Sequence, residues 1–304
     1  MRRSLIIIFL FSILVSESIR AQDFIPIWPV KCMPNSRGVI LKDSLDSDLI
    51  YRVSIPGLYI FKPSNAENKR AAVLIIPSGG YSVLSYATGF QMAKWFNTIG
   101  ITAFVLKYRL PYSPDLIESY KGPLQDAQRS IKIIRSRAKE WGYDDSKVGV
   151  MGASAGGHIA ACLSTIQGSW YDAIDSIDNK SFVPDFAILI SPVISMTDAA
   201  HVPSRNNLFR GKVSPEIAKL LSCQLHVYDQ TPPTFIIHAG DDHTVSPMNS
   251  VLYYTSLLRQ GVKGCSLHIF PKGDHSIRVR KNPGITSFWP VLAENWLIET
   301  GLIY

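Results

Sequence analysis

Residues 147–164 read KVGVMGASAGGHIAACLS, and this stretch decides the fold. An apolar run at 147–151, typical of a buried strand, is followed by an Ala- and Gly-rich helix that we expect from Ala155 to about Ser164. Between them lies the pattern G-x-S-x-G, centred on Ser154. Such a pattern arises by chance in roughly one of ten chains of this length. Its position at a strand-to-helix turn is therefore what makes it informative.

The turn around Ser154 requires small residues. A serine there adopts a strained conformation, and we expect side chains larger than hydrogen at 152 and 156 to collide with the neighbouring strand and helix. The helix that starts at Ala155 directs its N-terminal dipole at the site, where it favours a developing oxyanion. The pattern predicts a reactive serine, and the alternative is a tight turn without chemistry.

Apolar runs alternate with helical patterns along the chain. Further strands are expected at 72–76, 101–106, 186–190, 234–237 and 267–270, and further helices at 89–99, about 124–141 and about 250–258, with 295–303 as part of a closing helix. Continuous apolar strands, each followed by a helix, are typical of a parallel sheet covered on both faces. We therefore predict an α/β class and a single catalytic domain over residues 22–304. Residues 196–230 interrupt the alternation, so we expect an excursion over the substrate end of the sheet.

A serine hydroxyl is a weak nucleophile, so a base and an orienting carboxylate are needed at the same edge of the sheet. Among seven histidines we prefer His275 as the base, because it follows the loop that leaves the strand 267–270 at its carboxyl end. His243 is the main competitor, and His238 is expected to be a structural polar group at a strand end. The remaining histidines are assigned to packing or to the excursion: His158, His201, His226 and His268.

The acid is sought just past the strand 234–237, where Asp241 and Asp242 lie. We prefer Asp242 to Asp241, with Asp198 as a third choice. The chain order Ser154, Asp242, His275 is the order of the α/β-hydrolases. It predicts an α/β-hydrolase fold, with a mostly parallel central sheet and helices on both faces.

Two backbone donors are needed for the oxyanion. One is expected from the amide of Ala155, directly after the nucleophile. The other is expected from the loop at Gly79 and Gly80, where glycines let the backbone approach a substrate. A loop turn without a catalytic role is the alternative for these glycines.

Composition excludes several classes of protein. With 46% hydrophobic and 18% charged residues, the 304-residue chain is globular in composition rather than disordered. Its formal net charge is +7, and removing residues 1–21, which carry a net +2, leaves a mild and scattered +5. We therefore expect no nucleic-acid partner.

The four cysteines match neither a zinc nor a redox spacing, and we expect no metal and no organic cofactor. They are Cys32, Cys162, Cys223 and Cys265. At most two disulfides could form, with three connectivities, and four buried thiols are the equal alternative.

Residues 1–21 are typical of a secretory signal. Arg2 and Arg3 precede an apolar run at 5–15, and Ala21 is a suitable cleavage point before Gln22. The run is about half the ~20 residues that a membrane-spanning helix needs, so an uncleaved anchor is the weaker alternative. We expect a secreted or periplasmic protein without a stable membrane anchor.

Several segments together resemble the acetyl-xylan esterase and feruloyl-esterase-like (BD-FAE-like) branch of the bacterial α/β-hydrolases. They are PSGGY (77–81), YRLP (108–111), GASAGGH (152–158), PPTF (232–235) with Asp241 and Asp242, and GDH (273–275). The resemblance covers roughly residues 55–300. It implies that Asp242, the second aspartate of the pair, is the catalytic acid. It also implies a serine esterase that removes acetyl groups from plant polysaccharides or their fragments.

Two positions depart from that pattern: Ser78 and Ser276 stand where glycines are usual. Basic residues follow the second of them, which suggests a preference for acidic sugars, and a solvated basic turn is the alternative. We expect Tyr81, Arg278 and Arg280 to contact the substrate. Competing functions are a serine peptidase, a feruloyl or sialate O-acetyl esterase, a lipase, and an inactive carbohydrate-binding homologue.

Overall fold

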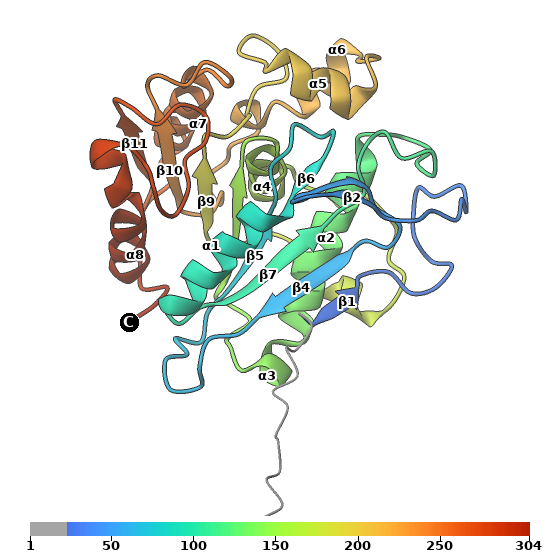
Figure 1. Ribbon diagram of the computed structural model, residues 1–304, viewed down its shortest axis with the longest axis horizontal. Helices are drawn as coiled ribbons and strands as arrows, with labels where there is room; N and C mark the ends of the chain where they lie inside the picture. The colour runs from blue at the N-terminus through green and yellow to red at the C-terminus, as the bar shows by residue number, and fades with distance from the viewer. Residues whose placement is uncertain (1–22) are drawn as a thin grey trace, which may run out of the picture.

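The computed structural model describes residues 23–304, so the predicted leader at 1–21 lies outside the described residues. A central sheet of eight strands has the order β1-β4-β7-β5-β8-β9-β10-β11 (Figure 1). Its strands are β1 (Phe24–Pro26), β4 (Gly57–Phe61), β5 (Ala72–Ile76), β7 (Thr102–Lys107), β8 (Val148–Ala153), β9 (Ala187–Ile190), β10 (Thr234–Ala239) and β11 (Ser266–Phe270). From β7 to β11 neighbouring strands run parallel, whereas β1 and β4 pair antiparallel at one edge. The predicted, mostly parallel sheet is confirmed.

Helices cover both faces of this sheet (Figure 1). One face carries α2 (Lys121–Ser136), α4 (Ala155–Thr165) and α7 (Met248–Arg259), and the other carries α1 (Tyr86–Thr98) and α8 (Trp289–Glu299). Strand β5 shows why both faces need cover, because successive side chains point to opposite sides. Leu74 packs into the cluster with α2 and α4, whereas Val73 and Ile75 pack into the cluster with α1 and α8.

The remaining elements are short. They are β2 (Ser44–Asp46), β3 (Leu49–Arg52) and β6 (Leu84–Ser85), which form a small antiparallel sheet, α3 (Ala138–Trp141), α5 (Val202–Phe209), α6 (Pro215–Leu220), and the 3₁₀ turns η1 (Ser176–Asn179), η2 (Cys223–Leu225) and η3 (Gly284–Phe288). Among residues 23–304, no helix combines the length and the apolar character needed to cross a bilayer.

Some predicted boundaries differ from the structure. The helix expected at 124–141 is two helices, because Arg137 leaves the helical conformation between α2 and α3. Gly142, with φ of 86°, then ends α3. The closing helix runs from Trp289 to Glu299, so it contains the first part of the predicted 295–303 and ends before 303. Pro290 lies in its first turn, where a missing N–H costs no hydrogen bond.

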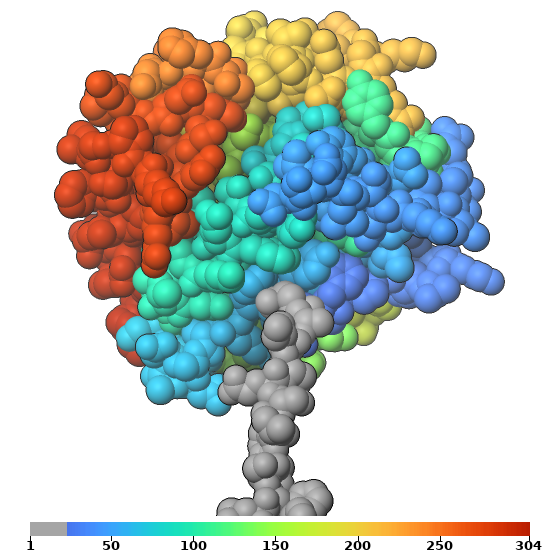
Figure 2. Space-filling model, in the orientation of Figure 1, coloured from blue at the N-terminus to red at the C-terminus, as the bar shows by residue number. Residues whose placement is uncertain are grey.

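The excursion at 196–230 contains α5, α6 and η2, and Figure 1 shows α5 and α6 beyond the end of the sheet at which the parallel strands terminate. In the space-filling view this segment forms a continuous layer over that edge (Figure 2). Asn207 on α5 donates a hydrogen bond of 2.7 Å to the carbonyl oxygen of Gly80, so the layer contacts the loop after β5. The excursion thus lies over one end of the sheet, as the sequence predicts.

Candidate active site

The turn from β8 to α4 holds Ser154 in a strained conformation, with φ of 53° and ψ of −121°. A Cβ atom at Gly152 would lie 2.2 Å from the carbonyl oxygen of Gly156. A Cβ at Gly156 would lie 2.2 Å from the carbonyl oxygen of Ile76 on β5. The expected collisions are therefore real, and they explain why only glycine fits at these two positions.

Three side chains from distant segments meet at this turn. The Ser154 Oγ lies 2.8 Å from His275 Nε2, and His275 Nδ1 lies 2.8 Å from Asp242 Oδ2. Ser154 is 8% exposed, and the His275 side chain is 20% exposed, so a substrate can reach the pair while little water surrounds it. This is the geometry in which an imidazole accepts a serine proton while a carboxylate fixes its tautomer.

Asp242 is the most heavily hydrogen-bonded member of the group. Its Oδ1 accepts from the amides of Thr244 at 2.8 Å and Val245 at 2.9 Å. Its Oδ2 lies 2.8 Å from His275 Nδ1 and 3.1 Å from His238 Nε2. Burial by itself raises the pKa of Asp242, but hydrogen bonds from His238, His275 and Val245 outweigh it and hold that pKa well below its ordinary value. The carboxylate is therefore ionised throughout the neutral range.

The alternatives for the acid and the base occupy other places. Asp241 Oδ1 accepts from the amide of Asp274 at 2.8 Å, so it braces the loop that carries the histidine. Asp198 and His243 are exposed. The structure thus distinguishes the two neighbouring aspartates by their contacts, whereas the sequence alone distinguished them poorly.

The loop after β5 is shaped by its two glycines. Gly79 has φ of 134°, and a Cβ there would lie 2.0 Å from the carbonyl oxygen of Val83. Gly80 has φ of 60°, and its carbonyl oxygen is held by the amide group of Asn207. Ala155 is the first residue of α4, so its amide is one of those that a helix leaves without an intrahelical acceptor. The amide of Ala155 is therefore a backbone donor directly after the serine.

The expectation that the Tyr81 side chain contacts a substrate is wrong in this structure. Tyr81 is 0% exposed, and its hydroxyl lies 2.6 Å from His158 Nδ1. The other ring nitrogen of His158 lies 2.7 Å from the carbonyl oxygen of Leu221. Because a carbonyl only accepts, Nε2 donates to Leu221 and Nδ1 accepts from the Tyr81 hydroxyl. Tyr81 thus links the loop after β5 to α4.

The structure does not bring Arg280 to the triad. Arg280 is exposed and lines a hollow of about 440 Å³ together with Lys94 and Trp95 of α1 and with Pro290, and no triad residue lines that hollow. Arg278 is exposed, and its backbone is bound to Asn282. Arg280, which was expected to contact the substrate, thus lies on the α1 side of the molecule.

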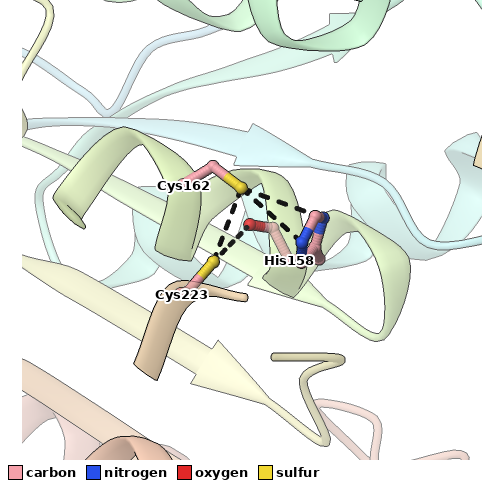
Figure 3. A group of neighbouring side chains, drawn as sticks. All are labelled: His158, Cys162 and Cys223. Atoms are coloured by element: carbon pink, nitrogen blue, oxygen red, sulfur yellow. Dashed lines mark hydrogen bonds between the residues drawn. The ribbon is translucent and has the colours of Figure 1, made fainter. Parts of the chain in front are cut away.

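Within residues 23–304, one group of three side chains lies close enough together to hold a metal ion: His158, Cys162 and Cys223 (Figure 3). Their ligand atoms lie within 4.8 Å of one another, and all three residues are buried. A metal would need a free lone pair on the imidazole, but one nitrogen is protonated toward Leu221 and the other accepts from Tyr81. The donor set therefore does not fit a metal without breaking a buried hydrogen bond.

Sequence reasoning missed two contributors to the site. His238 was assigned a structural role, although it donates to the catalytic-acid candidate, and Asn207 was not singled out. His238 lies four residues before Asp242, near the end of the strand β10 that precedes this aspartate, and that spacing was the available signal. Nothing local to Asn207 could have shown that it reaches Gly80, which lies 127 residues earlier.

Comparison with known proteins gives one family and several relatives. The BD-FAE family model matches residues 58–257. The chain is 37% identical over 220 residues to an acetylxylan esterase of Xylanibacter ruminicola, and the match covers 71% of this chain and 42% of that protein. It is 31% identical over 225 residues to endo-1,4-beta-xylanase B of Butyrivibrio fibrisolvens, covering 74% of this chain and 35% of that protein. The chain thus spans less than half the length of these two curated relatives.

Solved structures give matches over nearly the whole chain. The acetyl ester-xyloside bifunctional hydrolase of Caldicellulosiruptor lactoaceticus superposes with a TM-score of 0.79 at 31% identity, covering 93% of this chain and 98% of that one. A thermophilic esterase of Thermogutta terrifontis with bound propionate superposes with a TM-score of 0.69 at 25% identity, covering 89% and 96% of the two chains.

Proposed function

The chain belongs to the BD-FAE family and has the α/β-hydrolase fold, and from this premise we propose that it is a serine esterase that removes acetyl groups from plant polysaccharides or oligosaccharides. The observation that carries the proposal is the continuous hydrogen-bonded chain from Ser154 through His275 to Asp242. The names of its relatives, an acetylxylan esterase and an acetyl ester-xyloside hydrolase, support the choice of acyl group and sugar.

The first half of the reaction forms an acyl-enzyme. Ser154 Oγ attacks the ester carbonyl carbon while His275 Nε2 accepts the serine proton. Negative charge develops on the carbonyl oxygen, and the amides of Ala155 and of Gly79 or Gly80 stabilise it. The tetrahedral intermediate then collapses, the bond between the acyl carbon and the sugar oxygen breaks, and the imidazolium gives its proton to that oxygen, which leaves as a hydroxyl group. The acetyl group stays on the serine.

The second half restores the enzyme. His275 accepts a proton from water, whose oxygen attacks the acyl carbon, and the same amides stabilise the second oxyanion. Collapse returns the proton to Ser154 and releases acetate. Asp242 remains ionised throughout, holds the Nδ1 proton and stabilises each imidazolium. The cycle needs no group besides the chain, the ester and water.

Product analysis tests the proposed substrate. The purified protein and its Ser154→Ala variant are incubated with acetylated xylan, acetylated xylo-oligosaccharides, feruloylated arabinoxylan fragments, an O-acetylated sialate and aminopeptide substrates. We expect free acetate from the acetylated xylan or its fragments with the unmodified protein only. Ferulate, sialate deacetylation or peptide cleavage as the dominant product would instead assign a different hydrolase class to the same triad.

Arg280→Ala is expected to leave kcat/KM unchanged within about twofold for both neutral and uronate-bearing acetylated xylo-oligosaccharides, because exposed cations remote from the ester are screened at ordinary ionic strength. The measurement is acetate release at an ionic strength of about 0.15 M, close to the physiological value, with Lys139→Ala on α3 as a control at another exposed cation. A selective loss of activity toward the uronate-bearing substrate in Arg280→Ala alone would restore the preference for acidic sugars.

We also propose that the catalytic domain of residues 22–304 is exported to the periplasm or the medium after removal of residues 1–21. The apolar run after Arg2 and Arg3 supports this proposal. N-terminal sequencing of the protein recovered from cells tests it, and we expect the mature chain to begin at Gln22. A cytoplasmic protein that retains Met1 would contradict it.

A further inference from the structure

Cys162 and Cys223 are a buried pair of thiols that the proposed reaction does not use. Cys162 lies on α4, two turns after the nucleophile, and Cys223 begins η2 in the excursion. Their Sγ atoms are 3.5 Å apart, which is van der Waals contact, although the residues are 61 positions apart in the chain (Figure 3). Both residues are at most 3% exposed. We propose that these two cysteines close to a disulfide that fastens the excursion to the nucleophile helix.

The surroundings of the pair favour a disulfide over a metal site. A metal would have to displace Leu221 or Tyr81 from the imidazole of His158. A disulfide needs no such change, because each sulfur has only weak contacts to lose: Cys162 lies 3.6 Å or more from the His158 ring nitrogens, and Cys223 lies 3.9 Å from the His158 carbonyl oxygen. The sulfur atoms are already in contact at 3.5 Å, and the bond brings them to about 2.05 Å.

The chemistry is thiol–disulfide exchange with a disulfide oxidant. The thiolate of one cysteine attacks a sulfur of the oxidant, breaks its S–S bond and expels one thiolate. The second cysteine then attacks the mixed disulfide and expels the other thiolate. Two S–H bonds are lost, one S–S bond is formed within the chain, and the oxidant is reduced to two thiols.

Burial controls when this exchange can take place. Cys162 is 3% exposed and Cys223 is completely buried, so a disulfide oxidant cannot reach either sulfur in the folded state. Exchange therefore occurs while the excursion is open, during folding, and the closed bond is afterwards shielded from reductant. The loop that it closes includes α5, whose Asn207 holds Gly80. The bond thus stabilises the layer over the catalytic edge.

The test uses the full chain refolded with oxidised and reduced glutathione. Thiols are counted after denaturation, and proteolytic peptides are mapped by mass. We expect two free thiols instead of four, a linked peptide pair containing Cys162 and Cys223, and a Tm about 5–10 °C lower after reduction. The double variant Cys32→Ser/Cys265→Ser keeps only the pair, and we expect its count to fall from two thiols to none.

The variant Cys162→Ser separates the bond from general effects of oxidation. Its Tm is expected to be the same under oxidising and reducing conditions. Four free thiols in the refolded wild-type chain, a link involving Cys32 or Cys265 instead, or one equivalent of zinc retained by the reduced chain would each overturn the proposal. None of these readouts depends on esterase activity, so the experiment tests the disulfide independently of the proposed function.

A second observation concerns His238, near the end of β10. Its side chain is completely buried, and its Nε2 lies 3.1 Å from Asp242 Oδ2 and 3.0 Å from the carbonyl oxygen of Val245. Both partners are acceptors, so Nε2 carries a proton. Its Nδ1 lies 2.7 Å from Ser250 Oγ and accepts from that hydroxyl. The tautomer is therefore fixed.

The geometry points to His238 as a positioning residue for the triad, an inference that rests on the proposed function. His238 and His275 donate to the same oxygen of Asp242. The second donor orients the carboxylate and weakens its acceptance from His275. The titratable groups near Asp242 include these two histidines and, at longer range, His201 just before α5, and Asp198 and His243 line the same hollow as Asp242. Loss of the His238 donor therefore stabilises the His275 imidazolium.

In His238→Leu, we expect kcat to fall about 10- to 100-fold with little change in KM, because the base is misplaced. The acid limb of kcat/KM is expected to move to higher pH by about 0.5 unit, because Asp242 holds the imidazolium more strongly. His238→Gln offers an amide donor and should recover most of kcat and of the profile. Tm is recorded for each variant, since lost packing alone lowers Tm and leaves the acid limb in place.

An unshifted acid limb and a kcat within about twofold of wild type in His238→Leu would overturn this inference. Failure of the proposed function is recognised separately, because Ser154→Ala would then retain activity. If Ser154→Ala is inactive while His238→Leu matches the wild-type profile, only the role of His238 is rejected.

Discussion

Ser154→Ala is expected to lower kcat for ester hydrolysis by about 10⁴-fold or more, because the reaction loses the atom that attacks the carbonyl. Alanine tolerates the positive φ at this turn no better and no worse than serine, so the fold should be retained. The measurement is the steady-state rate with 4-nitrophenyl acetate and with acetylated xylan, together with the Tm of both proteins.

The control for this variant is Ser256→Ala on α7, a serine outside the catalytic turn. We expect it to keep near-normal kcat. If Ser154→Ala also kept a near-normal rate, with a Tm that shows it is folded, the nucleophile would have to be another residue and the proposed mechanism would be rejected.

Asp242→Asn is expected to have the second-largest effect, a loss of about 10³- to 10⁴-fold in kcat. The amides of Thr244 and Val245 hold one oxygen of the side chain, so the asparagine places its carbonyl there and turns its NH₂ toward His275 and His238. The NH₂ group of the asparagine, which is a donor, then faces the ring N–H groups of both His275 and His238. His275 escapes this conflict by moving its proton to Nε2, where it can no longer accept a proton from the nucleophile.

Asp241→Asn is the matched control, because the neighbouring aspartate accepts only from the amide of Asp274 among residues 23–304. An asparagine carbonyl can keep that bond, and we expect less than about a tenfold loss in kcat/KM. The two variants are compared by kcat, KM and Tm. A larger loss in Asp241→Asn than in Asp242→Asn would show that the acid has been assigned to the wrong residue.

The nucleophile turn could be predicted because its requirements are local. The glycines at 152 and 156 are separated from the neighbouring backbone by distances that leave no room for a side chain, and the sequence displays that constraint within five residues. His275 and Asp242 could be proposed from the rule that parallel strands end at one edge of a sheet. That rule says which edge of the sheet a residue lies at, but not which side chains touch there. Asp241 and His243 therefore remained alternatives for the acid and the base until the distances in the structure were given.

Other parts of the site depend on long-range packing, which sequence patterns do not encode. The direction of the Tyr81 side chain is set by a buried partner, His158, that lies 77 residues later in the chain. Arg280 turns to a hollow beside α1, although it follows His275 closely in sequence. The edge strand β1 and its neighbour β4 were not predicted, and β1, with three residues, is too short to show a period.

Labelling with a fluorophosphonate tests most directly whether His275 makes Ser154 reactive toward acyl-type electrophiles. The wild-type protein is treated with one equivalent of reagent, and the adduct is located by mass mapping of peptides. We expect a single adduct on Ser154, none in Ser154→Ala, and labelling that is slower by orders of magnitude in His275→Ala. Stoichiometric labelling of a different serine, or equally fast labelling of Ser154 without His275, would contradict the account.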